Sequence, residues 1–363
     1  MSRNRFQQWA LTGGLALGFV SASAAAGDFA VEKSGVPIPF LTAETSKVDG
    51  VIEASAIAAI GDGSLVLIAH DKTAEMFVAE AATGRIVGKP LTTPKFPNSA
   101  KIAPKWEGLA TDRQGFVYVI GTHSGKTGED RPSRSYLFKF RLTGGTQGSP
   151  VAIDETTVSR LRIEESLKTA LSQTVNDAKA VDKRKIEGLA IRELPARGNQ
   201  AARTELAIGL REPGDLVRVF AADLTKTPAD NAQLALRALF QFDAGQREGV
   251  RSQLTSLEYV AEWQGFVVTT ATEDDQNIFH GNTLWFVSDA QIAAGTAVKP
   301  EVIDVFEPAM KVEGITAIPA SDAQRGNANP NTVRFALSFD NDPHTTHIPS
   351  RMQQVVITKR SRD

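Results

Sequence analysis

The chain has 363 residues, of which 42% are hydrophobic and 23% are charged, and its formal net charge is -2. This composition is that of an ordinary globular protein with a sizeable core. A net charge so close to zero argues against a nucleic-acid-binding or membrane-surface role. The chain contains no cysteine, so disulfides cannot contribute to its stability.

The N-terminus has the pattern of an export signal. Arg3 and Arg5 precede an apolar run over residues 9–20, and small residues with an A-x-A pattern follow over 21–26. We therefore predict a signal peptide over residues 1–26, a mature domain over residues 27–363, and a periplasmic or secreted location. A membrane anchor is the alternative, but the apolar run is short and ends in small residues. After cleavage we expect no membrane partner, and we expect no nucleic acid as a partner either.

A short motif recurs through the chain. It stands as WEGLA at residues 106–110, and EGLA and EGIT repeat it at 187–190 and 313–316. Two further copies have serine in place of the glutamate. We call the first Glu or Ser of each copy its anchor, which gives five anchors: Ser55, Glu107, Glu187, Ser256 and Glu313. Recurrence of this kind indicates an array of supersecondary units.

Each anchor begins a run of short strands separated by turns. The first unit has strands over residues 55–60, 64–69, 75–79 and 84–91. The second starts at 107 and continues over 116–121 and 135–142. The third starts at 187 and continues over 205–210, 216–223 and 235–242. The fourth starts at 256, with strands over 265–272, 283–287 and 301–306, and the fifth starts at 313, with strands over 333–339 and 353–359.

Four short strands from each repeat are typical of a β-propeller blade. We predict an all-β protein, a five-bladed β-propeller forming a single domain, with six blades possible if an insertion forms a degenerate one. The fifth unit is one strand short. Residues 36–41 could complete it, which would close the ring and remove its free edges.

One insertion, over about residues 155–183, has helical spacing. Apolar residues recur at roughly helical intervals over residues 158–179. We expect a helix packed on the outside of the propeller, or alternatively a lid over a site.

The first strand of a propeller blade lines the central channel, so the five anchors should gather around the axis. Three carboxylates there would repel one another unless a cation binds, a carboxyl is protonated, or basic neighbours pair with them. An oxygen-only ligand set selects a hard ion, and we predict that the five anchors hold Ca²⁺. The alternative is that the glutamates only hydrogen-bond backbone at the blade starts.

The second strand of each unit runs back to the same face, where every unit carries polar residues. Some of these polar residues are basic and others are acidic, and we expect the two groups to have different roles. We expect His123, Lys126 and Arg211 to bind a small anionic substrate. We expect Glu273, Asp274 or Asp340 to position an attacking water or act as a general base.

The blade starts WEGLA, IEGLA and VEGIT, with YVIGTHSGK after the second, resemble an uncharacterised bacterial family of exported propellers. That family neighbours proteins labelled as phytase-like with esterase activity. The anchor order Ser, Glu, Glu, Ser, Glu also resembles the calcium-activated nucleotidases, or apyrases, which are five-bladed propellers with a central Ca²⁺. This resemblance implies a calcium site at Ser55, Glu107, Glu187, Ser256 and Glu313. Nucleotide-contact loops of that family have no match here, and the helical insertion is a departure from it.

These observations predict an exported, calcium-binding propeller that hydrolyses a phosphate ester or anhydride. A propeller that binds a ligand or another protein without catalysis is the alternative, because the fold alone cannot distinguish the two.

Overall fold

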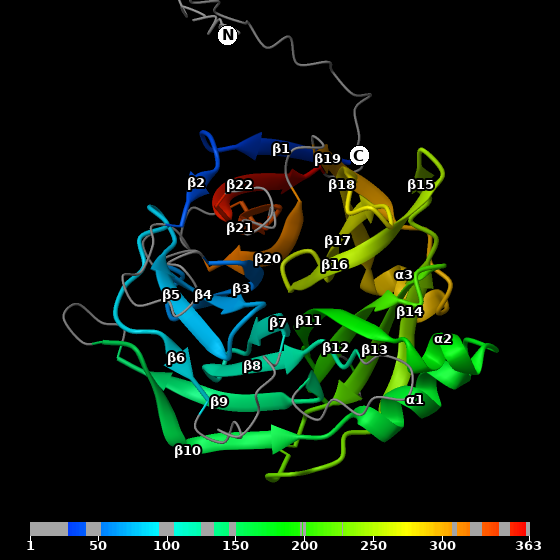
Figure 1. The fold of residues 1–363 in the computed structure, drawn as a ribbon, viewed down its shortest axis with the longest axis horizontal. Coiled ribbons are helices and arrows are strands. Elements are labelled where there is room, and N and C mark those ends of the chain that lie inside the picture. The colour runs from blue at the N-terminus through cyan, green and yellow to red at the C-terminus, as the bar shows by residue number, and fades with distance from the viewer. Residues whose placement is uncertain are drawn as a thin grey trace, which may run out of the picture.

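A computed structural model describes residues 28–40, 52–93, 105–124, 134–144, 150–196, 198, 201–226, 228–306, 311–319, 329–340 and 349–360. The predicted signal peptide and Lys126 lie outside these residues. The described strands form five antiparallel sheets, arranged as blades around a common axis, so the five-bladed propeller is confirmed (Figure 1).

Each blade is a ladder of strands that runs outward from the channel. Blade 1 contains β3 (Ala54–Ile60), β4 (Leu65–His70), β5 (Glu75–Glu80) and β6 (Leu91–Thr92). Blade 2 contains β7 (Trp106–Thr111), β8 (Phe116–Gly121), β9 (Leu137–Thr143) and β10 (Ala152–Leu161). Blade 3 contains β11 (Lys185–Leu194), β12 (Arg203–Glu212), β13 (Val217–Asp223) and β14 (Leu236–Phe242).

The remaining two blades have additional strands. Blade 4 contains β16 (Val250–Val260), β17 (Gly265–Glu273), β18 (Phe279–Ser288) and β19 (Glu301–Phe306), and β15 (Gln246–Arg247) pairs with β16. Blade 5 contains β20 (Val312–Ile318), β21 (Thr332–Phe339) and β22 (Arg351–Lys359), followed outward by β1 (Phe29–Lys33). The innermost strands β3, β7, β11, β16 and β20 contact one another in that order and surround the channel.

The ring is closed by the N-terminal segment, as expected, but mainly by a different part of it. β1 pairs antiparallel with β22 from Phe29↔Lys359 to Lys33↔Val355. Within the predicted segment 36–41, only β2 (Ile38–Pro39) pairs with β22. Pro37 and Pro39 lack an N–H to donate, which limits this segment to a short pairing at the sheet edge.

The helical insertion is shorter than predicted. β10 covers residues that were expected to be helical, and Val158 and Leu161 are buried against the blades. The helices are α1 (Glu164–Ser172) and α2 (Ala178–Asp182), and a third, α3 (Asp289–Ala294), follows β18. Val158 and Leu161 are three residues apart, a spacing that is compatible with a helix but also occurs in a strand with a bulge. The pairing of β10 with β9 has a register shift of this kind between Asp154 and Ser159.

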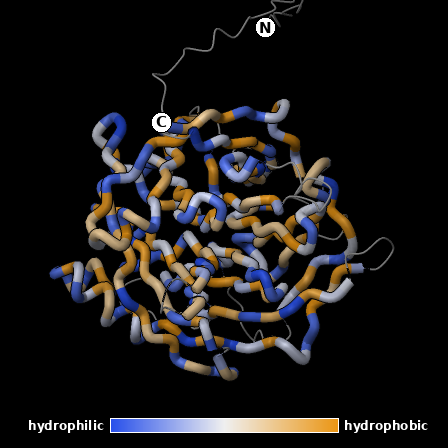
Figure 2. Tube along the Cα trace, turned by 180° about the vertical axis from the view of Figure 1, so that it is seen from behind, coloured by the Kyte–Doolittle hydropathy of each residue, from blue (hydrophilic) through white to orange (hydrophobic). Residues whose placement is uncertain are grey.

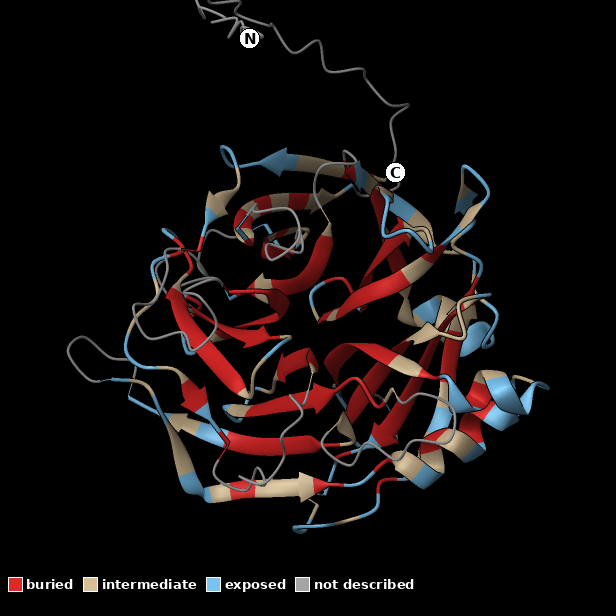
Figure 3. Cartoon of the chain, viewed as in Figure 1, coloured by how far each residue is buried: buried red, intermediate tan, exposed pale blue. Residues whose placement is uncertain are grey.

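The core lies between the blades. Buried residues predominate in the inner strands, while exposed and intermediate residues are frequent in β10, β1, α1 and α2 (Figure 3). Seen from behind, hydrophobic stretches recur along the strands of the ring (Figure 2). Close packing at the axis explains the glycines after the glutamate anchors: a Cβ on Gly108 would lie 2.7 Å from Leu189 Cβ, and one on Gly314 would lie 2.9 Å from the backbone nitrogen of Ile57.

Candidate functional site at the axial mouth

The five anchors occupy one structural position, a one-residue bulge near the start of each inner strand. The register with the second strand shifts across Ser55, Glu107, Glu187 and Glu313. In blade 4 the shift falls across Thr255, between Leu254 and Ser256. The predicted fourth anchor, Ser256, is therefore wrong by one residue, and Thr255 is the equivalent position. A bulge makes two residues oppose one, so counting along the sequence alone could not separate Thr255 from Ser256.

The hydroxyl anchors connect neighbouring blades. Ser55 Oγ donates to the carbonyl oxygen of Trp106, the residue before the anchor of blade 2. Thr255 Oγ1 donates in the same way to the carbonyl oxygen of Val312, before the anchor of blade 5, at 2.7 Å. Ser256 Oγ instead accepts from the N–H of Ile315 at 3.2 Å. Each of these hydroxyls satisfies backbone at a blade junction.

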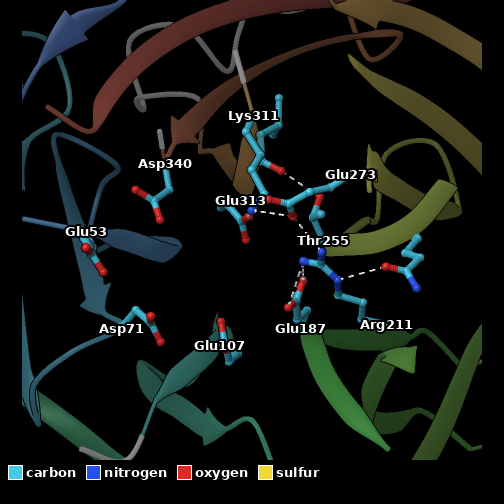
Figure 4. Close-up of polar contacts among 12 residues, drawn as sticks. Glu53, Asp71, Glu107, Glu187, Arg211, Thr255, Glu273, Lys311, Glu313 and Asp340 are labelled. Atoms are coloured by element: carbon cyan, nitrogen blue, oxygen red, sulfur yellow. Dashed lines mark hydrogen bonds and ion pairs between the residues drawn. The ribbon is translucent and has the colours of Figure 1, made fainter. Parts of the chain in front are cut away.

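The glutamate anchors carry charge into the channel, where basic side chains meet them (Figure 4). Arg211 Nη1 lies 3.1 Å from Glu187 Oε2, and Arg211 Nη2 lies 2.8 Å from Glu273 Oε2. Lys311 Nζ lies 2.9 Å from both Glu273 Oε2 and Glu313 Oε1. Lys185 pairs with Glu187. Cations and carboxylates thus alternate along the arc formed by blades 3, 4 and 5.

These contacts set the protonation states on this arc. Burial would raise the pKa of Glu187 and of Glu273, but the neighbouring Arg211 and lysines outweigh it and lower both pKa values. Burial raises the pKa of Glu313 despite the opposing attraction of Lys311. Glu187 and Glu273 are therefore held ionised at neutral pH.

On the other arc, Glu107 is a buried carboxyl with little compensation. Glu107 is only 5% exposed, and its Oε1 forms an ion pair with Lys185 Nζ at 3.9 Å. Burial raises its pKa well above the usual range. Lys185 opposes this effect, while repulsion from Asp71 and Glu187 adds to it. Glu107 is thus the axial carboxyl most strongly biased toward its protonated form in blades 1 and 2.

Asp71, at the end of β4, has the opposite environment. Lys72 Nζ lies 2.9 Å from Asp71 Oδ2, and Lys105 Nζ lies 3.3 Å from Asp71 Oδ1. Burial would raise the pKa of Asp71, but these two lysines lower it. In Figure 4, Asp71, Glu107 and Glu313 extend toward the same central space. The mouth therefore brings together one carboxyl whose pKa is raised and another whose pKa is lowered.

The structure brings some of the other predicted site residues to this mouth. Arg211 and Glu273 are in the ion-pair network. Asp340 is drawn at the rim of the same space, and its Oδ1 accepts a hydrogen bond from Ser350 Oγ at 3.0 Å.

His123 and Asp274 have other partners. His123 Nδ1 lies 3.0 Å from Glu164 Oε2 at the start of α1, and Glu164 also pairs with Arg184. Asp274 Oδ1 accepts from the N–H groups of Gln276 at 2.9 Å and Ile278 at 2.8 Å, so it stabilises the turn between β17 and β18. The polar partners of both residues therefore lie apart from the axial ion pairs.

Sequence reasoning missed the lysines, although a signal for them exists. Lysine stands two residues before every glutamate anchor, as Lys105, Lys185 and Lys311. Before the hydroxyl anchors the same position holds Glu53 or Gln253. Side chains two residues apart on a strand lie on the same face, so a Lys-x-Glu repeat places a lysine beside an anchor. Lys185 and Lys311 pair with their own anchors, Glu187 and Glu313, whereas Lys105 pairs with Asp71. Asp71 was noted only as part of a polar turn.

The arrangement does not fit the predicted calcium set. Ser256 is out of register, and Glu187 is occupied by Arg211 and Lys185. Among the described residues, no group of three or more His, Cys, Asp or Glu side chains is placed so as to hold a metal ion. Of the three ways to relieve the carboxylate repulsion, pairing with basic neighbours is the one visible in these contacts.

Comparison with known proteins supports the fold only. No protein-family model matches the chain, and no curated protein matches it. Among solved structures, a GH62 hydrolase in complex with xylotriose is similar over 91% of this chain and 98% of its own, with 10% identity and a TM-score of 0.51. An α-L-arabinofuranosidase from Lactobacillus brevis matches over 84% of this chain and 91% of its own, with 11% identity and a TM-score of 0.45.

A calcium-binding protein, regucalcin from Agrobacterium tumefaciens str. C58, matches over 86% of this chain and 92% of its own, with 10% identity and a TM-score of 0.37. In the part of the chain that the structure describes, no helix is long and apolar enough to cross a membrane.

Proposed function

We propose that the axial mouth is a hydrolytic site for a small phosphate ester or anhydride, with Glu107 as general acid and Asp71 as general base. The observation that carries this proposal is the unequal pairing of two carboxyls that extend toward one space: Asp71 lies between Lys72 and Lys105, whereas Glu107 is buried with Lys185 at 3.9 Å. The pKa values shift accordingly, upward for Glu107 and downward for Asp71. Paired groups whose environments separate their pKa values in this way are suited to acid and base roles at one pH. The likeness to a GH62 hydrolase shows the fold alone, so it does not carry the assignment.

The two carboxyls divide the proton transfers of a hydrolysis. Asp71 accepts a proton from water as the water oxygen attacks phosphorus. Glu107 donates its proton to the leaving oxygen as the bond from phosphorus to that oxygen breaks. The proton gained by Asp71 and the one lost by Glu107 balance when both groups re-equilibrate with solvent.

The opposite arc offers positive charge to the phosphoryl group. Lys185, Arg211 and Lys311 come from blades 3 and 5, and their side chains are 27%, 14% and 15% exposed. They can neutralise the oxygens of a phosphate while keeping their carboxylate partners. His123, paired with Glu164, is not placed to join them. We propose a periplasmic or secreted location, on the strength of the export signal in residues 1–26.

Calcium is the second proposal for the same mouth. It is favoured by one observation: Asp71, Glu107 and Glu313 extend toward a common space, where a cation would offset their mutual repulsion. These three carboxyls are not grouped closely enough to hold an ion as they stand, so binding would have to draw them together. The two proposals compete, because a calcium ligand at Glu107 must be ionised and a general acid must be protonated.

The test of the general acid compares two phosphate monoesters with different leaving groups. We expect Glu107→Gln to lower kcat/KM for phenyl phosphate by about 10²- to 10⁴-fold. The loss should be smaller for p-nitrophenyl phosphate, because p-nitrophenolate leaves with less need for a proton. Wild-type activity should fall as pH rises through the pKa of Glu107 and also as pH falls through the pKa of Asp71.

The matched control is Asp274→Asn, which alters a carboxylate of the same face that holds a turn outside the axial ion pairs. It should leave both rates unchanged. Equal losses for the two substrates in Glu107→Gln would contradict the general-acid role. Failure of the wild-type protein to hydrolyse either ester would contradict the hydrolase and favour a propeller that binds without catalysis.

A further inference from the structure

The mouth of the channel opposite the anchors contains a cavity of about 1770 Å³. The inner strands begin at the anchors, so the residues at their other ends belong to the far mouth. Residues from all five inner strands line this cavity, among them Ile60, Thr111, Ile191, Glu258, Tyr259 and Ile318. The volume exceeds the several hundred cubic ångströms of a typical small-molecule site, so a ligand of that size fits without rearrangement of the ring.

Glu258 is the unusual residue in this wall. It stands three residues after the anchor of blade 4, where the other blades have Ala58, Ala110, Ala190 and Thr316. Glu258 Oε1 accepts from the N–H of Ala317 in the next blade at 3.0 Å. Thr316 Oγ1 accepts from the N–H of Ala59 in its own next blade, also at 3.0 Å. A threonine hydroxyl is therefore sufficient for this junction bond. The carboxyl of Glu258 has a second oxygen that the bond does not use, and it carries a negative charge when it is ionised.

Acidic side chains outnumber basic ones among the described residues that line this cavity. Burial raises the pKa of Glu258 to about 8, the N–H of Ala317 opposes this, and Glu262 adds repulsion. The described cavity lining also contains Asp62, Asp112 and Glu193, against the basic residues Arg113 and Arg334. Arg113 Nε lies 2.7 Å from Glu193 Oε2, so its charge is already matched.

The remainder of the wall is largely apolar. Ile60, Ile191 and Ile318 come from three different blades and surround the channel end. Acidic side chains in an apolar wall favour a ligand that combines positive charge with a hydrophobic body. A bare metal ion suits the wall less well, because no cluster of metal-binding side chains occurs among the described residues.

We propose that this cavity binds a small organic cation with an apolar body, and that Glu258 is its counter-ion. The cation would enter from the mouth opposite the anchors, so this site is independent of the proposed hydrolysis. Binding of a cation favours the ionised carboxylate, so Glu258 should lose its proton when the ligand binds below its pKa.

The test uses benzyltrimethylammonium, whose charge does not change with pH, and titration calorimetry on the mature protein. We expect saturable binding that is at least about tenfold tighter at pH 9 than at pH 6, because Glu258 is mostly ionised only at the higher pH. At pH 7, titrations in buffers of different ionisation enthalpy should show release of close to one proton. Benzyl alcohol, a neutral comparison ligand, should bind more weakly and without this pH dependence.

Two variants distinguish a specific counter-ion role of Glu258 from a general effect of the negative charge of the cavity wall. Glu258→Gln keeps the acceptor for Ala317 and should bind the cation weakly and equally at both pH values. Asp62→Asn removes an exposed charge of the same wall whose pKa is lowered by its hydrogen bonds to Ser64, so the tenfold pH effect should persist in it. Absence of saturable binding, pH-independent binding by the wild type, or equal binding of benzyl alcohol would each overturn the proposal. Because the proton-release measurement needs only the wild-type protein, a Glu258→Gln variant that fails to fold does not leave the proposal untested.

Discussion

At the scale of single residues, one bulge position serves two purposes. Where it holds Ser55 or Thr255, a hydroxyl donates to the carbonyl before the next anchor and joins two blades. Where it holds glutamate, the side chain enters the channel and a lysine stands two residues earlier. That lysine pairs with the anchor in blades 3 and 5, and with Asp71 in blade 2. The residue two positions before the anchor therefore indicates which purpose the anchor serves.

The hydroxyl bridge gives a direct prediction for stability. Thr255→Val should lower the free energy of unfolding by about 1–3 kcal/mol, because the buried Val312 carbonyl loses its donor while the volume of the side chain is retained. Thr269 Oγ1, 2.8 Å from Thr255 Oγ1, loses a partner as well. Urea unfolding measures the change. Thr255→Ser keeps the hydroxyl and should be the milder variant, and a Val variant as stable as wild type would show that the bridge contributes nothing.

The sequence allowed four of the five anchors to be placed, because the repeated motif is nearly the same in each blade. It could not place the fourth, since a bulge has no signature of its own and Thr255 and Ser256 are both hydroxyl residues. The ion pairs were within reach through the Lys-x-Glu repeat. The contrast between Glu107 and Asp71 could not be predicted from the sequence. It depends on burial and on Lys105, which only the folded ring brings to Asp71, in addition to the neighbouring Lys72.

At the scale of elements, β1 is the strand that completes the ring. Phe29, 7% exposed, packs its ring against Trp263 at 5.6 Å and Phe286 at 5.4 Å, measured between ring centroids. The strand therefore adds both hydrogen bonds to β22 and aromatic contacts to blade 4. Chain ends that are tied down in this way remove the free edge of the last blade.

Phe29→Ala should lower the free energy of unfolding by about 3 kcal/mol, because it leaves a cavity beside two buried aromatic rings. Guanidinium unfolding measures this loss of stability. Light scattering measures a second expected effect, the association of molecules through the exposed edge of β22. Val36→Ala is the matched control, since Val36 is 79% exposed and its truncation should change neither. If the two variants behaved alike, closure would depend on the segment around β2 instead of β1.

The elements also show where periodicity misleads. Residues 158–161 belong to β10, the outermost strand of blade 2, although their apolar spacing is compatible with a helix. The strand is paired with β9 on one side only, and its partly exposed positions carry polar residues that blur the alternation expected of a strand. The helix begins at Glu164, after this strand has ended.

At the scale of the whole molecule, the distribution of charge around the axis bears on the metal. Three inner strands, β7, β11 and β20, bring a glutamate anchor to one mouth, and Lys185, Arg211 and Lys311 enter the same ring as paired cations. Mutual repulsion of unpaired carboxylates would make folding depend on a bound ion. A ring that carries its own cations removes that dependence. The calcium prediction and the protonated Glu107 therefore have different consequences for the stability of the entire propeller.

Thermal unfolding of chelator-treated mature protein, with and without added Ca²⁺ or Mg²⁺, distinguishes the two. If the ion pairs balance the ring and Glu107 is protonated, we expect the unfolding temperature to stay the same on adding either ion, and metal analysis of untreated protein to find no calcium. A bound ion would instead stabilise the folded state by RT ln(1 + [L]/Kd), about 2.7 kcal/mol at a hundredfold excess over Kd. A rise specific to Ca²⁺ that disappears in Glu107→Gln would establish the ion at the axis and contradict the general-acid role. Glu258→Gln, at the other mouth, is the control that should leave the response to Ca²⁺ unchanged, because its carboxyl lies at the opposite end of the same channel.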